Sequence, residues 1–133
     1  MNPISEDIKD LLEADSSLEL ELGVNLFVGM EPPTPDDCVT LYDTGGRGPQ
    51  LTFNRNEHYY HGRFQVRIRS KSYLIGMNLA QTLMDYLHGR GHEEINSTDY
   101  NLIQAGSAPA FIGRDANHRL LFVVNFEVQR REA

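Results

Sequence analysis

The chain has 133 residues, of which 40% are hydrophobic and 23% charged, and its formal net charge is −7. This length fits one domain, 1–133, that can bury a core without disulfides or a structural metal. No apolar run approaches the roughly 18 residues of a membrane-spanning helix, and the acidic start lacks the basic and apolar regions of a signal peptide. The single cysteine, Cys38, excludes an intrachain disulfide and favours folding in a reducing cytoplasm.

The acidity is concentrated at one end of the chain. Residues 1–22 carry seven acids and one base, whereas the remaining residues carry twelve acids and eleven bases. Within that nearly neutral remainder, bases gather between Arg55 and Lys71 against the one acid Glu57. This asymmetry indicates a two-ended pattern through which copies of the chain could contact head to tail. Two independently solvated faces are the alternative, and the acidity argues against free duplex DNA as a ligand.

The first elements can be placed from apolar spacing. Apolar residues at helical intervals predict an amphipathic helix over about 3–15, with acids on its other face. Residues 18–22 alternate apolar and acidic side chains, which fits a short strand and a continued helix equally. A short strand is expected over 25–29, followed by a loop that the prolines within 32–35 impose.

The middle of the chain contains the clearest strand. Residues 38–43 are predicted to form a strand, and the glycines that follow open a flexible stretch to about residue 56. Over 63–69 the alternation is regular. One face of this strand is apolar and the other basic or polar: Phe64, Val66 and Ile68 against Arg63, Gln65, Arg67 and Arg69.

A second helix is predicted over 72–88, with Ser72 as its N-cap. Its apolar stripe is expected to comprise Ile75, Leu79, Leu83, Tyr86 and Leu87. Three strands follow, at 100–105, 110–113 and 119–129, and residues 115–118 have the composition of a hairpin turn between the last two. The order of elements favours an α+β fold, with a mainly antiparallel sheet and both helices packed on one face.

The basic face of strand 63–69 is the main candidate for an interaction site. Like charges in a row become favourable only when an acidic surface meets them, in the same chain or on a neighbour. We expect a subunit interface that joins the bases Arg63, Arg67 and Arg69 to the helix acids Glu6, Asp7, Asp10 and Glu13. Contact with DNA phosphates is a second reading, and a solvated face is a third. Reversing Arg67 and Arg69 to Glu should abolish association while the monomer stays folded.

Asp43-Thr44-Gly45 is the sharpest enzymatic motif. In aspartic proteases such loops meet in a dimer, so that paired carboxylates share one proton. Phe111-Ile112-Gly113-Arg114 resembles a second fragment of the retroviral enzymes, but the helix over 72–88 has no place in that all-β fold. We therefore interpret Asp43 as a strand-end residue that caps a glycine turn, with a dimeric protease as the alternative, and expect no catalytic residue.

No metal or cofactor site is expected from the remaining reactive side chains. The histidines do not follow the spacing of a metal-binding motif and have no cysteine nearby. They are His58, His61, His88, His92 and His118. The acids Asp36 and Asp37 beside Cys38 should raise the pKa of its thiol, which argues against a nucleophile.

Taken in order, several stretches resemble the minor capsid and tail-terminator-like proteins of tailed bacteriophages. They follow the acidic helix and read Asn25-Leu26-Phe27-Val28-Gly29 before the prolines, Val39-Thr40-Leu41-Tyr42-Asp43-Thr44-Gly45-Gly46, Phe64-Gln65-Val66-Arg67-Ile68-Arg69 before a helix, Phe111-Ile112-Gly113-Arg114-Asp115 with a turn, and Leu121-Phe122-Val123-Val124-Asn125-Phe126.

The resemblance implies a virion structural protein without enzymatic activity. Such proteins form a ring, commonly of six subunits, that ends the tail tube and joins it to the head connector or stopper. The implied partners are copies of the chain, the tube protein and the connector, with transient contact to DNA in the ring lumen and assembly in the host cytoplasm. Arg47, Arg55 and His58 are the expected contacts to tube or connector. A head-stopper or tail-tube protein of the same virion is the alternative.

Overall fold

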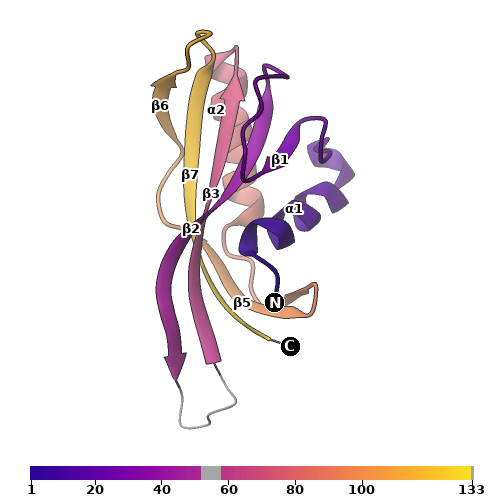
Figure 1. Ribbon diagram of the computed structural model, residues 1–133, viewed down its shortest axis with the longest axis vertical. Coiled ribbons are helices and arrows are strands. Elements are labelled where there is room, and N and C mark those ends of the chain that lie inside the picture. The colour runs from indigo at the N-terminus through magenta and orange to yellow at the C-terminus, as the bar shows by residue number, and fades with distance from the viewer. Residues whose placement is uncertain (52–57, 133) are drawn as a thin grey trace.

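The computed structural model describes residues 1–51 and 58–132, which form a seven-stranded sheet with two α-helices (Figure 1). The elements are α1 (Ile4–Ala14), the 3-10 turn η1 (Ser16–Leu18), β1 (Leu26–Val28), β2 (Cys38–Leu51), β3 (His58–Ser70), α2 (Tyr73–Leu87), β4 (Glu93–Ile95), β5 (Thr98–Ala105), β6 (Ala110–Arg114) and β7 (Leu120–Glu132). The predicted α+β class is confirmed. Residues 18–22 are neither of the two predicted forms, because η1 ends at Leu18 and only Leu22 makes a bridge, to Leu26.

The strand order is β1-β2-β3-β7-β5-β4, and β6 also pairs with β7. Every pairing is antiparallel except that of β1 with β2, which is parallel. One edge of β7 is shared by two strands, since β6 lies beside residues 120–123 and β5 beside residues 126–132. In the part of the molecule that contains β6, the sheet therefore ends at β1 on one side and at β6 on the other.

β2 and β3 form a long hairpin. The prediction of a flexible stretch directly after residue 43 was therefore wrong as far as Leu51. Pairing continues past Asp43 to Leu51, through irregularities in register between Asp43 and Gly46 and between Arg47 and Gln50. Gly46 has a φ of 124°, and a Cβ there would lie 2.2 Å from the carbonyl oxygen of His61. Glycine therefore allows the bent strand to keep its pairing. In Figure 1 the paired ends of β2 and β3 reach beyond α1 and α2 at the lower end of the molecule.

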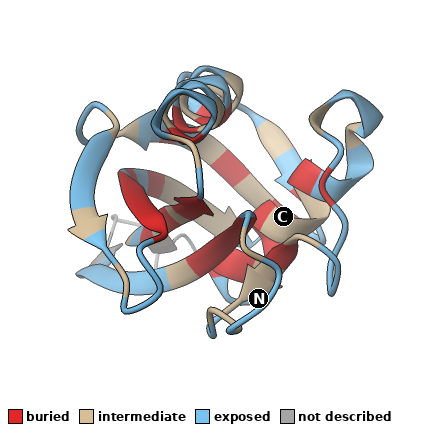
Figure 2. Ribbon diagram, turned by 90° about the horizontal axis from the view of Figure 1, so that it is seen from above, coloured by how far each residue is buried: buried red, intermediate tan, exposed pale blue. Residues whose placement is uncertain are grey.

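Both helices pack on the face of the sheet that carries the alternating apolar residues of β3 and β7. α1 buries Ile4, Ile8 and Leu12 against this face, and Phe64 of β3 stacks on Phe126 of β7 with ring centroids 4.8 Å apart. Buried positions concentrate where sheet and helices meet (Figure 2). The apolar spacing of the sequence thus located the core correctly.

Four of the five residues predicted for the apolar stripe of α2 face the core: Leu83 and Leu87 are buried, and Leu79 and Tyr86 pack against it partly buried. The Ser72 hydroxyl accepts a hydrogen bond from the Ile75 N–H at 3.3 Å, which confirms the N-cap, but Ile75 itself is exposed. The buried residues are Gly76, Ala80, Leu83 and Leu87. A Cβ at Gly76 would lie 2.3 Å from the ring of Phe122, so the helix approaches β7 through a glycine. This close approach places Gly76 in the core, which apolar periodicity alone does not reveal.

Candidate functional site

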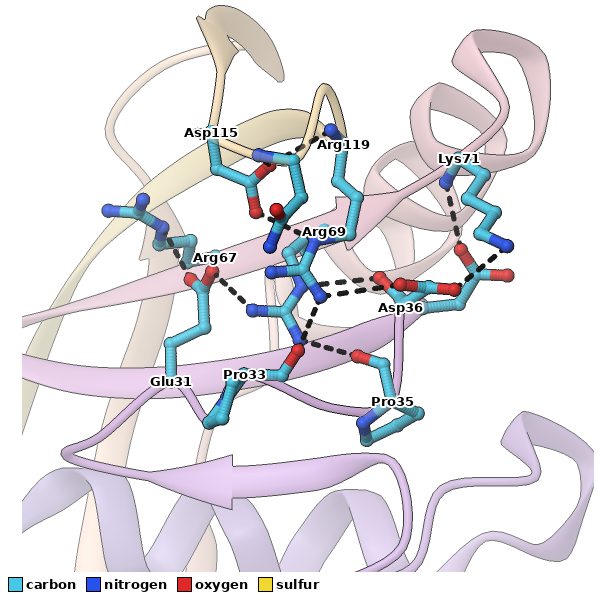
Figure 3. A network of polar contacts seen from close by, with 11 residues as sticks. Glu31, Pro33, Pro35, Asp36, Arg67, Arg69, Lys71, Asp115 and Arg119 are labelled. Atoms are coloured by element: carbon cyan, nitrogen blue, oxygen red, sulfur yellow. Dashed lines mark hydrogen bonds and ion pairs between the residues drawn. The ribbon is translucent and has the colours of Figure 1, made fainter.

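The loop of residues 30–37, which connects β1 to β2, folds over one end of the basic face of β3. Arg69 is 3% exposed, and its Nη1 lies 3.0 Å from Oε1 of Glu31. Its Nε donates to the carbonyl oxygen of Asp36 at 3.2 Å, and its Nη2 donates to the carbonyl oxygen of Pro35. Figure 3 shows these groups converging on one guanidinium. Arg69 is thus a buried residue that fastens the loop to the sheet.

Arg67 shares the same acid. Its Nε lies 2.7 Å from the other oxygen of Glu31, so one carboxylate bridges two bases of the predicted row (Figure 3). Sequence analysis missed Glu31, because it lies more than thirty residues from its partners in a loop without periodicity. The acid that compensates Arg67 and Arg69 therefore comes from this loop and not from α1.

Two further cations extend this cluster along the loop. Lys71 Nζ lies 2.8 Å from Asp36 Oδ2, and the hydrogen bond from Lys71 is the main cause that lowers the pKa of Asp36. Arg119, which is buried, lies 3.3 Å from the other oxygen of Asp36 and 2.7 Å from Asp115. Asp115 also accepts hydrogen bonds from the N–H groups of Asn117 and Arg119, which forms the predicted hairpin turn. The loop is thereby tied to β3, β7 and the β6–β7 turn.

Arg63 lies on the part of this face that the loop leaves open. Its side chain is 54% exposed and its Nε lies 3.5 Å from Glu127. A shallow hollow of about 410 Å³ lies beside it, lined by Thr44, Arg63, Gly106, Ser107, Asn125, Phe126 and Glu127. Arg63 is the half-exposed member of the predicted row, and its contact with a neighbouring chain or with DNA stays a prediction.

The four acids of the predicted interface all have partners within the chain. Lys9 Nζ lies 3.2 Å from Glu6 and 2.9 Å from Asp10, and its hydrogen bond is the main cause that lowers the pKa of Asp10. The Glu13 carboxylate accepts a hydrogen bond from the Leu22 N–H at 2.7 Å. The interface through Glu6, Asp10 and Glu13 is untested; within the chain, Lys9 pairs with the first two, and Glu13 contacts a backbone N–H.

Asp7 has a different role from the one expected, because its side chain is fully buried. It accepts a hydrogen bond from the hydroxyl of Tyr100 and one from Asn96 at 2.9 Å, and Arg130 lies 3.7 Å away. Burial, together with the bond to Asp7, raises the pKa of Tyr100 well above its usual value. Asp7 therefore joins α1 to β5 and β7 and is not available to a neighbouring chain in this structure.

Asp43, the residue of the protease-like motif, caps α1 from the sheet. Its two carboxylate oxygens accept hydrogen bonds from the Ser5 N–H at 3.0 Å and from the Ser5 hydroxyl at 2.6 Å. This corrects the interpretation of Asp43 as the cap of a glycine turn at a strand end, because β2 continues past it. Both oxygens are engaged in a structural contact, as expected for a helix-capping group.

Two of the residues predicted to contact tube or connector, Arg47 and His58, lie on the paired strands β2 and β3. Arg47 is exposed and pairs in register with His61, and both line a hollow of about 190 Å³ with residues of β5 and β7. His58 is the first residue of β3. Arg55 lies outside the described residues. The prediction for these three residues is untested.

Reactive groups do not assemble into a recognisable chemical site within residues 1–51 and 58–132. No group of three or more His, Cys, Asp or Glu side chains in this part of the chain is arranged to hold a metal ion. Cys38 is buried, and this burial is the main cause that raises the pKa of its thiol. Among these residues, no helix has the length and apolar character needed to cross a membrane.

Comparisons with known proteins give a family and a likeness to solved structures. Residues 6–131 match the family model described as bacteriophage tail terminator protein. One solved structure superposes with a TM-score of 0.56 at 11% sequence identity, covering 98% of this chain and 92% of that chain, which shows a shared fold. No curated protein matches the sequence.

Proposed function

Since this chain belongs to the bacteriophage tail terminator family, we propose that it forms a ring at the head-proximal end of the tail tube. There it stops tube growth and provides the joint to the head connector. The carrying observation is the extent of the match, which runs from α1 to the end of β7 and so includes both helices and all seven strands. The proposal thus concerns the whole fold and not an appended module.

The family is a structural one, and the chain is a phage tail protein. Two features of the molecule support a role in assembly. Its sheet leaves a polar face partly open beside Arg63, and its β2–β3 hairpin reaches beyond the helices (Figure 1). A hairpin of this kind can extend along the ring axis to a neighbouring layer, whereas the sheet edges lie to the sides. We assign the hairpin, with Arg47, to contact with the tube or connector.

Two alternatives remain within assembly and one outside it. A tail-tube protein would polymerise by itself, and a head-stopper would bind the connector but leave tube length unchanged. The dimeric protease would need Asp43 to leave Ser5 and meet the same residue of a second chain. No contact of Asp43 favours that arrangement.

Polymerisation of the tube protein in the presence of this chain tests the proposal. We expect electron micrographs to show shorter tubes with a ring at one end, and tube length to fall as the chain is added. An unrelated acidic protein of similar mass serves as the control. Unchanged tube lengths at molar excess would contradict termination, and self-polymerisation of the chain into tubes would favour the tube-protein alternative.

A further inference from the structure

Large apolar side chains are exposed at both lateral edges of the sheet. At the β6 edge, Phe111 and Ile112 are 42% and 49% exposed, and the half-exposed ring of Tyr73 from α2 lies 5.5 Å from that of Phe111. At the β1 edge, Leu22 and Val24 are 46% and 55% exposed. Figure 1 places β6 and β1 on opposite sides of the molecule. Exposed apolar groups that cluster in this way typically mark interaction surfaces.

Unpaired charges of opposite sign accompany these two edges. Among the described lysines and arginines, only Arg47 and Arg114 lack an acid within ion-pair distance. Arg114 ends β6 and is exposed. Glu19 and Glu21, which are exposed just before Leu22, have no hydrogen bond or ion pair to their carboxylates within the described chain. Each edge thus combines apolar side chains with a charge that no residue among 1–51 and 58–132 compensates.

We propose that these edges are the two halves of one contact between neighbouring copies of the chain. The basic edge is Tyr73, Phe111, Ile112 and Arg114, and the acidic edge is Glu19, Glu21, Leu22 and Val24. The basic edge of one subunit meets the acidic edge of the next, with apolar side chains at the centre and ion pairs at the rim. This inference rests on the proposed ring and names the surfaces that close it.

Charge decides between a ring and a symmetric dimer. Two basic edges placed face to face would bring Arg114 near Arg114, and two acidic edges would bring Glu21 near Glu21. Only the contact of unlike edges pairs the charges, and a contact of unlike surfaces repeats around a ring when its rotation closes. The other acids without a partner among the described residues, Glu94 on β4 and Glu132 at the end of β7, lie on other strands than β1 and β6.

Charge reversal of each edge tests the proposal in the full-length chain. The first variant is Arg114→Glu, and the second combines Glu19→Arg and Glu21→Arg. We expect each variant by itself to raise the protein concentration at which half of the chain is assembled about tenfold or more, because like charges then meet. Mixing the two variants should restore assembly, since every contact in an alternating ring then joins opposite charges. Native mass spectrometry should then show rings that contain both variants in equal number.

Matched controls reverse free charges elsewhere. Glu94→Arg and Glu132→Arg should assemble like the unmodified chain, and Arg114→Gln should weaken assembly less than Arg114→Glu. Circular dichroism checks that each variant is folded. This inference would be overturned if Arg114→Glu assembled as well as the unmodified chain, or if the mixture of the two variants failed to assemble. Either result would leave the proposed function standing. The proposed function itself would be overturned if the unmodified chain were a monomer and also left tube length unchanged.

Discussion

Asp43 fastens the N-terminal helix to the sheet, since its carboxylate accepts both hydrogen bonds that Ser5 donates to it. α1 has no side-chain cap of its own, because Pro3 occupies the N-cap position. We expect Asp43→Ala to lower the free energy of unfolding by about 1–2 kcal/mol, the usual cost of losing a helix cap. Urea unfolding measures this loss. Asp85→Ala, which removes an exposed carboxylate bonded to Gln81 on α2, is the control and should change stability by less than about 0.5 kcal/mol.

Arg69 is the residue whose expected role changes most. The sequence suggested that reversal of Arg67 and Arg69 would leave the monomer folded, but Arg69 is buried against Glu31 and two carbonyl oxygens. Arg69→Leu should cost about 3–5 kcal/mol, because it removes a buried partner of the Glu31 carboxylate and of these carbonyls. Arg69→Glu should cost more, since it places two carboxylates together.

Arg63→Leu provides the comparison for this prediction. Arg63 comes from the same face of the same strand, but its ion pair with Glu127 is half-exposed on both sides. Exposed pairs contribute at most about 1 kcal/mol. Equal losses for Arg63→Leu and Arg69→Leu in chemical denaturation would contradict the structural role of the loop cluster.

The attachment of the loop of residues 30–37 depends on pH, because it uses the ionised carboxylate of Asp36. The hydrogen bond from Lys71, aided by attraction to Lys71 and Arg119, holds the pKa of Asp36 below its ordinary value of 3.8. A carboxyl with a lowered folded-state pKa contributes stability that is present above its unfolded pKa and lost as pH falls through the folded one. Asp36→Asn should therefore be less stable than the parent chain at pH 7, with the difference shrinking below about pH 4. Urea unfolding of both chains at pH 7 and below about pH 4 measures this difference in stability. A difference that stays constant with pH would contradict the role of the ionised Asp36.

Element prediction succeeded where one regular pattern governed a whole segment. β3 was recognisable because Phe64, Val66 and Ile68 face the core in strict alternation. The extension of β2 to Leu51 was not, because glycine usually interrupts strands, and here the partner strand holds Gly46 in place. α2 and most of its apolar stripe were placed correctly, but the burial of Gly76 and the exposure of Ile75 were not, because the contact of Gly76 with Phe122 joins distant residues.

For the whole molecule, charge segregation in the sequence overstated how much charge is free. Glu31 compensates Arg67 and Arg69, and Asp7 is consumed by a buried contact with Tyr100. Linear patterns show which charges cluster but not which of them meet after folding, because the partners are separated by dozens of residues. Arg114 stood out in the sequence only within the protease-like Gly113-Arg114 fragment, and Glu19 and Glu21 only within the alternation of residues 18–22, so no pattern indicated that these charges stay unpaired.

The two proposals give the molecule different surfaces for different partners, and a single substitution on the hairpin can separate them. Arg47 is exposed at the projecting hairpin and has no acidic partner among the described residues. If the hairpin contacts the tube or connector while the sheet edges join subunits, Arg47→Glu should leave ring assembly unchanged but weaken tube capping about tenfold, as expected for loss and reversal of one interface charge. Arg114→Glu should instead impair both activities, because a ring must form before it can cap a tube.

Parallel measurements of ring assembly by native mass spectrometry and of tube length in electron micrographs distinguish these outcomes. Loss of the ring in Arg47→Glu would place the hairpin between subunits, and normal capping by this variant would remove Arg47 from the tube contact.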